Sequence, residues 1–406
     1  MALNADTLTV PDRARVILTG CCLSRSAGGP FESVSGLARA LAGNTPTTVH
    51  VVGTYADPSE WPHDRTQWPA ERLTAMPWRG LRSASSLRRA VCAVFAGSGS
   101  ALVHGQGLWD ASSVAMAMLA HETAVPLVVS PRGMLEPWAL AHRRAKKTIA
   151  WHLWQKGVLQ SAALLHATSA QEAASIRAIG LHNPIAVIPN GVGIPTMTEP
   201  ALAPSRHAGQ ASRRCVYLSR IHKKKGLPLL LRAWSALRPP GWTLDIAGFG
   251  EEAYVAAIRA LIRELDCPSI HFVGEKSGDA KAEFLKGAHL FVLPSYSENF
   301  GVAVAEAMAH AIPVVATHGT PWRVLADKRL GWWVPPTMET IRDALQEATR
   351  LAPDELHAMG TRARHYAAET FSWAGVARSM AACYNWIHRG GPLPDPILLD
   401  GMRLVT

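Results

Sequence analysis

Short apolar runs alternate with longer amphipathic segments along the whole chain. In the first half the apolar runs are RVILTG, TVHVVG, ALVHGQ, PLVVSP, LLHAT and IAVIPN, and the series resumes with CVYLSR, TLDIAG, IHFVG, LFVLPS and IPVVAT. Continuous apolar runs separated by helix-length segments are typical of parallel strands that helices cover on both faces. The pattern predicts an α/β protein with parallel sheets.

A segment without periodicity separates the two series of strands. It reads GVGIPTMTEPALAPSRHAGQASRR and is rich in Pro, Gly, Ser and Ala, which indicates a linker or loop. The chain has 406 residues, more than one hydrophobic core usually serves. We therefore predict two doubly wound domains that face each other across a cleft, with a boundary near residue 195. Ligands should bind at the carboxyl ends of both sets of strands.

The segment PSYSENFGVAVAEAMAHAIPVVAT carries a candidate ligand site. Asn299 and Gly301 are turn and capping types, so a helix should begin near Phe300. Its first N–H groups lack intrahelical partners and its dipole is positive there, so a pyrophosphate can bind without a metal. Glu298 and Glu306 would lie roughly 9–12 Å apart at about 1.5 Å per residue, which suits hydroxyls at two ends of a sugar nucleotide. The alternative is a solvated loop glutamate followed by an ordinary helix glutamate.

Two further loops offer groups that suit a diphosphate. Arg220 and Lys225 follow the first strand of the second series, in SRIHKKKG, where fixed cations would stabilise a departing nucleoside diphosphate. A solvated basic loop is the alternative for this run. Gly28 and Gly29 precede the helix FESVSGLARALA, and glycine there lets the backbone approach a ligand closely.

Composition narrows the partners only in part. A formal charge of +10 favours acidic partners, and nucleotides, anionic lipid headgroups and nucleic acid all qualify. The six cysteines lack zinc-type or dense disulfide spacing, which fits structural thiols in a reducing cytosol. The N-terminal residues lack a signal-peptide pattern, and no run of about 18 apolar residues occurs. We expect a cytoplasmic protein without a membrane span.

The glutamate pair in SENFGVAVAE resembles the E-x7-E motif of the retaining glycosyltransferases of family 4, which have the GT-B fold. Segments in matching order extend the resemblance over nearly the whole chain: GGPFESVSGLARAL, HATSAQEAASIRAIGL, VIPNGV, YLSRIHKKKGLPLLLRAW, AGFGEE, FVGE and FSW. The resemblance implies an acceptor-binding domain over 1–195, a nucleotide-sugar-binding domain over 196–370, and a terminal segment, 371–406, that crosses back to the first domain.

The resemblance also implies roles for individual residues. Glu298 would hold hydroxyls of the transferred sugar, Glu306 the ribose, and Gly274 with Glu275 the base. The implied site residues near the transferred sugar and the leaving diphosphate are Glu298, Arg220, Lys225, His104 and Arg132. Those around the nucleotide are Gly28, Gly29, Gly248, Gly274, Glu275, Asn299, Phe300, Gly301 and Glu306.

The chain departs from the family pattern after the strand in VVSPRG. Many relatives carry a histidine there, near the reacting sugar, whereas this chain has Pro131, Arg132 and Gly133. An arginine can supply positive charge but cannot act as a base at neutral pH. His104, at the end of ALVH, could approach the site instead, although a histidine at a strand end is more often a structural hydrogen-bonding group.

Missing motifs exclude several other chemistries. No Asp-x-Asp is present to hold a metal-bound sugar nucleotide, so we expect a metal-independent enzyme with a UDP- or GDP-sugar donor and no cofactor. The chain has no P-loop motif and no nucleophile elbow of an α/β hydrolase. No nucleic-acid-binding module is recognisable, so we expect no nucleic-acid partner.

A mixed basic and aromatic segment bears on the acceptor. It contains His142, Arg143, Arg144, Lys146 and Lys147, with Trp138, Trp151 and Trp154 nearby. Such a surface could rest on the inner face of an anionic membrane and meet a lipid-linked glycan acceptor, or it could be an ordinary solvated helix face. The resemblance favours biosynthesis of an envelope polysaccharide or lipopolysaccharide. A small soluble acceptor and a non-catalytic sugar-nucleotide-binding partner are the alternatives.

Overall fold

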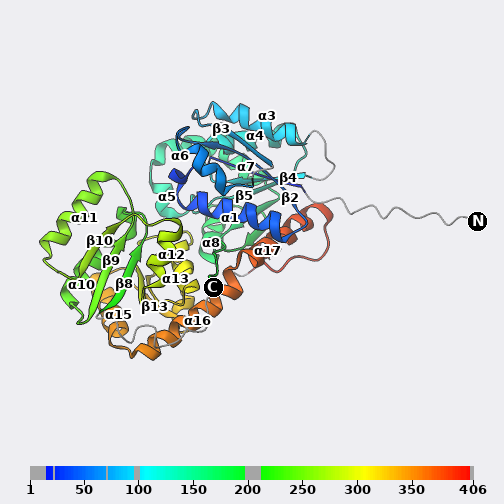
Figure 1. Cartoon of the computed structure of the whole chain (residues 1–406). Helices are drawn as coiled ribbons and strands as arrows, with labels where there is room; N and C mark the ends of the chain where they lie inside the picture. Colours follow the sequence, from blue (N-terminus) through cyan, green and yellow to red (C-terminus); the bar gives the residue numbers. More distant parts are fainter. Residues whose placement is uncertain (1–14, 22, 70–71, 96–100, 197–211, 403–406) are drawn as a thin grey trace, which may run out of the picture. The chain divides into compact units, whose positions relative to one another are not determined.

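The computed structural model describes residues 15–21, 23–69, 72–95, 101–196 and 212–402 (Figure 1). The chain forms two compact units: residues 1–191 with 373–406, and residues 192–372. The first division lies close to the boundary expected near residue 195. Cys22 and most of the predicted linker lie outside the described residues.

An eight-stranded sheet forms the centre of the first unit. Its strand order is β14-β7-β6-β5-β4-β1-β2-β3, and every pairing is parallel except that of β14 with β7. The strands are β1 (Arg15–Gly20), β2 (Thr48–Tyr55), β3 (Leu73–Pro77), β4 (Ala101–Gln106), β5 (Leu127–Ser130), β6 (Leu164–Ala167), β7 (Ile185–Val187) and β14 (Ile397–Leu398). The buried runs of β4 and β5 reflect helices on both faces, since every residue of these strands is buried.

Helices cover this sheet and include one from the end of the chain. They are α1 (Gly29–Asn44), α2 (Trp61–Asp64), α3 (Ser83–Phe95), α4 (Ala111–Glu122), α5 (Pro137–Ala141), α6 (Arg144–Ala150), α7 (Lys156–Ser161), α8 (Ala170–Ala178) and α17 (Trp373–Arg389). Helix α17 packs on α1, where a Cβ on Gly36 would lie 2.1 Å from the Trp373 ring. The first unit therefore needs the last helix to complete its core.

A six-stranded parallel sheet forms the second unit, in the order β10-β9-β8-β11-β12-β13. Its strands are β8 (Arg213–Leu218), β9 (Trp242–Ala247), β10 (Ile270–Gly274), β11 (Leu290–Leu293), β12 (Val314–Thr317) and β13 (Gly331–Val334). Its helices are α10 (Leu227–Leu237), α11 (Glu252–Glu264), α12 (Gly278–Lys286), α13 (Val302–Ala309), α14 (Val324–Asp327), α15 (Met338–Arg350) and α16 (Pro353–Phe371).

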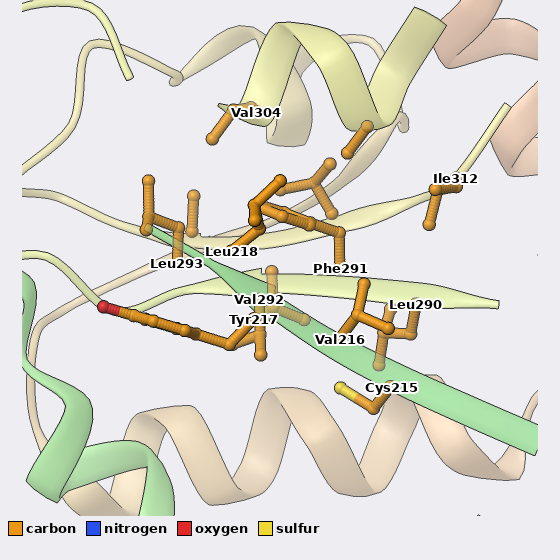
Figure 2. Packing of buried hydrophobic residues seen from close by; sticks show 14 of the residues in the cluster. Cys215, Val216, Tyr217, Leu218, Leu290, Phe291, Val292, Leu293, Val304 and Ile312 are labelled. Carbon is orange, nitrogen blue, oxygen red and sulfur yellow. The ribbon is translucent and has the colours of Figure 1, made fainter. Parts of the chain in front are cut away.

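The core of the second unit is built around the two central strands. Figure 2 shows Tyr217 of β8 and Phe291 of β11 packed among apolar neighbours of the same cluster, to which Val304 of α13 also belongs. All three side chains are fully buried. Apolar residues on both faces of a strand make such a strand rigid, so the loops after β8 and β11 start from fixed positions.

The expected α/β fold with two parallel sheets is confirmed. Among the strands, β1, β4 and β10 have the predicted bounds, whereas the sequence pattern missed β3, β13 and β14. Strand β3 is a half-exposed edge strand, and β14 has two residues whose pairing with β7 depends on the tertiary fold.

Two further findings concern the thiols and the membrane. The five described cysteines are free. Over the described ranges, no helix is both long enough and apolar enough to cross a bilayer.

Candidate active site

The loop after β8 is fastened to the segment that follows β11. The Tyr296 N–H donates to the Lys224 carbonyl over 2.8 Å. Gly226 has φ of 64°, and a Cβ there would lie 2.0 Å from the carbonyl oxygen of Pro294. Only glycine satisfies both conditions, because the positive φ and the close approach each disfavour a side chain. The contact sets the position of the neighbouring Lys225.

Contacts with the loop after β12 hold the other side of the Glu298 segment. The Glu298 N–H donates to the Gly319 carbonyl over 2.7 Å, and the Trp322 indole N–H donates to the Phe300 carbonyl over 2.5 Å. The Phe300 ring packs against Trp322 and Phe371, with ring centroids 5.1 and 5.6 Å apart. The Phe300 side chain therefore belongs to the core, and only its backbone remains for a ligand.

Glu298 and Lys225 form an ion pair. The Lys225 Nζ donates to the Glu298 carboxylate, which also accepts from the Ser295 hydroxyl over 2.7 Å. Glu298 is only 7% exposed. Burial by itself raises the pKa of this carboxyl, but the Lys225 ammonium and the Ser295 hydroxyl hold the pKa below its ordinary value. Two predicted site residues thus meet, with the carboxylate ionised.

Helix α13 begins two residues later than predicted and carries Glu306. Gly301 precedes it with φ of 78°. The first N–H groups of an α-helix lack partners one turn back, and here the Val304 N–H donates to the Gly301 carbonyl over 2.9 Å. A Glu306 carboxylate oxygen accepts from the Lys281 Nζ of α12 over 2.6 Å. Sequence reasoning missed Lys281, since nothing in its spacing links α12 to α13.

Three neighbouring strand ends are tied together around Arg220. A Cβ on Gly248 would lie 1.9 Å from the Ser219 carbonyl oxygen, and the Ile221 N–H donates to the Phe249 carbonyl over 2.7 Å. The Gly248 N–H in turn donates to the Gly274 carbonyl over 2.9 Å. Gly248 thus fixes the backbone beside Arg220, whose side chain is exposed.

Glu275 follows Gly274 at the end of β10 and is exposed, as expected for a residue at the edge of a site. Asn299 is partly buried between Glu298 and Phe300. The second unit therefore gathers most predicted nucleotide-binding residues on the loops at the carboxyl ends of β8, β9, β10 and β11.

In the first unit, Gly28 and Gly29 open helix α1 as predicted. Gly28 has φ of 65° and precedes the helix, while a Cβ on Gly29 would meet no atom within 4 Å. Packing does not require glycine at the second position. Open space there is compatible with close approach of a ligand.

His104 lies in a buried chain of hydrogen bonds. Its Nδ1 is 2.7 Å from the Tyr384 hydroxyl of α17, and its Nε2 is 2.7 Å from the Ser130 hydroxyl. The Ser130 hydroxyl is also 2.7 Å from Nδ1 of His166, whose Nε2 is 2.8 Å from the Ile188 carbonyl oxygen. Burial lowers the pKa of both histidines. Because both ring nitrogens of His104 are occupied, the structural reading of this residue gains support over the catalytic one.

Arg132 occupies a left-handed conformation with φ of 56°. Its guanidinium donates to the Gln106 side-chain oxygen over 3.0 and 2.7 Å and to the Asn190 side-chain oxygen over 2.7 Å. The guanidinium of Arg132 thus links the ends of β4 and β5 to Asn190, one residue before the first segment of this unit ends. Sequence reasoning missed Gln106 as a partner of Arg132.

The expected absence of a metal remains a prediction. Among the described residues, no group of three or more His, Cys, Asp or Glu side chains has the arrangement of a metal site. The charged groups that act on Glu298 are instead Lys225 and Lys224, and cations suit an anionic ligand.

Comparison with protein families finds a match for each unit. The glycosyl transferase 4-like domain matches residues 28–191, and the model for glycosyl transferases group 1 matches residues 205–366. Over 182 residues the chain is 31% identical to a putative colanic acid biosynthesis glycosyltransferase, WcaL, of Salmonella typhimurium. This alignment covers 42% of the chain and 45% of that protein.

Two solved structures extend the similarity to the whole fold. A sucrose-phosphate synthase from Thermosynechococcus elongatus superposes with a TM-score of 0.76 at 21% identity, covering 93% of this chain and 100% of that one. Anabaena Alr3699/HepE, in complex with UDP and glucose, superposes with a TM-score of 0.72 at 17% identity, covering 91% and 99%. At these identities the superpositions establish the fold.

Proposed function

We propose that this GT-B glycosyltransferase moves a sugar from a UDP- or GDP-sugar to an acceptor hydroxyl, with retention of configuration and without a metal. The observation that carries the proposal is the set of charged side chains on fixed loops: Lys225 against Glu298, Arg220 close by in sequence, and Glu306 on α13. The similar structure that contains UDP and glucose supports a nucleotide-sugar donor.

Each group has a defined task in this proposal. The start of α13 and the cations Arg220 and Lys225 hold the diphosphate, whose negative charge grows as the bond to the sugar breaks. The Lys225 ammonium has three protons, so it can bind a phosphate oxygen while it keeps its contact with Glu298. Glu298 accepts from sugar hydroxyls and Glu306 from ribose hydroxyls. Glu306 would then exchange its contact with Lys281 for the ligand.

We further propose a lipid-linked glycan as the acceptor, in the biosynthesis of an envelope polysaccharide, with the protein held at the inner face of the membrane. The similarity to a putative colanic acid biosynthesis glycosyltransferase supports this setting. A small soluble acceptor is the alternative, since one similar structure is a sucrose-phosphate synthase, named for a small sugar phosphate.

A thermal-shift panel with UDP-, GDP- and ADP-sugars, each with chelator, tests the donor site. A ligand at about 100 times its dissociation constant should stabilise the protein by roughly 2.7 kcal/mol. We expect one base to be selected and Glu306→Ala to reduce the shift. Glu347→Ala, an exposed glutamate on α15, is the matched control. No shift with any nucleotide sugar would overturn the proposed donor site. A shift that is lost when chelator is added would overturn the metal-independent part of the proposal.

A further inference from the structure

The first unit contains an open cavity of ≈ 680 Å³ between α5, α6 and the loop after β4. Trp109 and Trp151 contribute aromatic walls, and Leu140 contributes an aliphatic one. Arg144 and Lys147 of α6 add two positive charges to a lining that is mainly apolar and includes one hydroxyl, that of Thr148. An apolar cavity with a few converging cations suits a ligand that is apolar in one part and anionic in another.

Two irregular backbone features form the wall around Trp109. Trp109 has φ of 69°, a conformation that costs a bulky residue of the order of 1 kcal/mol or more. Its N–H donates to the Gln155 side-chain oxygen over 3.0 Å, and Gln155 ends a π-helical turn over Trp151–Gln155. Within the described structure, the buried indole N–H of Trp109 has no hydrogen-bond partner. Strained backbone, π-turns and buried donors without partners are features that proteins concentrate at ligand sites.

The charged side chains that line the cavity, Arg144 and Lys147, are both positive. Residues 137–171 include five lysines and arginines and no aspartate or glutamate. The Lys147 Nζ lies 5.8 Å from the centre of the Trp109 ring. Burial, followed by repulsion from Arg143, lowers the pKa of Lys147. A bound anion would relieve both effects, because it would replace lost hydration and offset the neighbouring charge.

Large apolar side chains are exposed on the same helices. Ile149 is 60% exposed and Leu153 is 72% exposed, and their spacing of four places them on one side of the helix. Trp138 at the start of α5 is 45% exposed. Exposed aliphatic and indole side chains among lysines and arginines are typical of helices that lie in the interface of an anionic bilayer.

We propose that this cavity binds the phosphate-bearing headgroup of an anionic phospholipid, with Arg144 and Lys147 on the phosphate and the Trp109 and Trp151 rings against its apolar part. Ile149 and Leu153 then enter the acyl region beside it. This proposal gives a site for the membrane contact proposed above and rests on the proposed function only for the location of the protein at the membrane. Lipid binding in the cavity requires neither a sugar-nucleotide donor nor sugar transfer.

Vesicle binding by the full chain tests this site directly. The probes are vesicles of phosphatidylcholine with phosphatidylglycerol and vesicles of phosphatidylcholine alone, without nucleotide sugar. We expect the wild type to bind the first and hardly the second. Arg144→Gln with Lys147→Gln should weaken binding about tenfold or more, since each charge near the surface contributes about 1 kcal/mol. Arg82→Gln with Arg89→Gln, the same charge change on exposed residues in and beside α3, should have a much smaller effect.

A second pair of variants tests the apolar contact. Leu153→Ser should weaken vesicle binding several-fold with an unchanged melting temperature, because the side chain is exposed and contributes little to the core. Leu81→Ser, also exposed in the first unit, is the matched control and should bind like the wild type. Equal vesicle binding by Leu153→Ser and Leu81→Ser would overturn the proposal. So would an equal loss of binding in the Arg144/Lys147 variant and the Arg82/Arg89 variant.

A soluble anion distinguishes a lipid site from a simple phosphate site. Inorganic phosphate, compared with chloride at the same ionic strength, should displace little protein from the vesicles. Phosphate has no apolar part to occupy the apolar region of the cavity. Displacement by phosphate but not by chloride would replace the lipid proposal with a free-anion site. Failure of vesicle binding would leave the donor-binding test unaffected, so the two proposals can fail separately.

Discussion

The two units use the carboxyl ends of their strands in opposite ways. In the second unit, the loop after β8 carries Arg220 and Lys225 and helix α13 carries Glu306, and all three charged groups are exposed or partly exposed. In the first unit, the corresponding ends carry His104 and His166, fully or nearly fully buried and engaged on both ring nitrogens. The polar groups of the second unit can exchange their present partners for a ligand. Those of the first unit are engaged in hydrogen bonds within the protein.

The difference has a clear energetic basis. The partly exposed ion pair of Lys281 with Glu306 can exchange partners at little cost, because water and a polar ligand can both compensate its charges. A buried neutral network cannot, since each group left without a partner costs about 1–3 kcal/mol. The second unit is thus suited to bind and release an anionic ligand, and the first unit offers a fixed support.

The largest expected effect in this comparison comes from Lys225→Ala. Loss of a fixed cation at the leaving diphosphate should lower turnover by about 10²- to 10³-fold. Steady-state kinetics with the selected donor would measure it, with the melting temperature as a check on the fold. Lys225→Arg should recover part of the activity, and Lys223→Ala, exposed in the same loop, should stay near the wild type. Unchanged turnover in folded Lys225→Ala would remove the residue from the site.

A smaller effect is expected from Gly226→Ala, which tests whether the loops of the second unit are fixed. The new Cβ would meet the Pro294 carbonyl oxygen in a backbone with φ of 64°, so the loop must move. We expect donor affinity to fall and stability to drop by about 1–3 kcal/mol. Gly241→Ala is the control, since it has φ of 71° but no atom nearby. Equal effects of the two substitutions would mean that backbone strain alone is responsible.

The smallest effect is a difference in acid sensitivity. Burial, with Arg132 second, lowers the pKa of His166 to about 3, so the unfolded chain binds the proton more readily. Its contribution is therefore complete above about pH 6.5 and falls as the pH drops toward 3, by about 1.4 kcal/mol per pH unit. The pKa of Glu298 is also lowered, but its contribution falls only below its unfolded value near 4.5.

Hydrogen exchange at pH 7.5 and pH 5 would measure this difference. We expect strands β5 and β6 to lose protection by about 2 kcal/mol through His166 alone, and more because burial also lowers the pKa of His104. Strands β8 and β11 should lose less, since His222 and His310, the histidines of that unit with a lowered pKa, are exposed and partly buried, respectively. The second unit is the internal control. Equal loss in both sheets, or earlier loss in the second unit, would contradict the assignment of a buried neutral histidine.

The sequence predicted what depends on local pattern. Buried strands with flanking turns were recognisable, so most strands of both sheets were placed, and Gly28 and Gly301, which the sequence singled out, have φ of 65° and 78°. The edge strand β3 was not recognised, because its run LTAMP is half exposed and lacks the continuous apolar character of a central strand.

What escaped prediction are contacts between residues distant in sequence. Nothing local indicates that Tyr384 meets His104 or that Lys281 meets Glu306, since each pair forms only after helices pack. His166 could have been found, because LLHA repeats the pattern of ALVH with a histidine near a strand end. The donor roles of Glu298, Glu306, Arg220 and Lys225 stay predictions until a ligand is bound.

The path of the chain has a consequence for its synthesis. The second unit is continuous, and its two ends meet where the Val192 N–H donates to the Phe371 carbonyl over 2.8 Å. The first unit is interrupted and requires α17 and β14, which come from residues after 372. On the ribosome, the later-made unit can thus finish folding first. Until α17 is made, the earlier-made sheet keeps the face that α17 covers exposed, and exposed apolar surface of this kind favours aggregation.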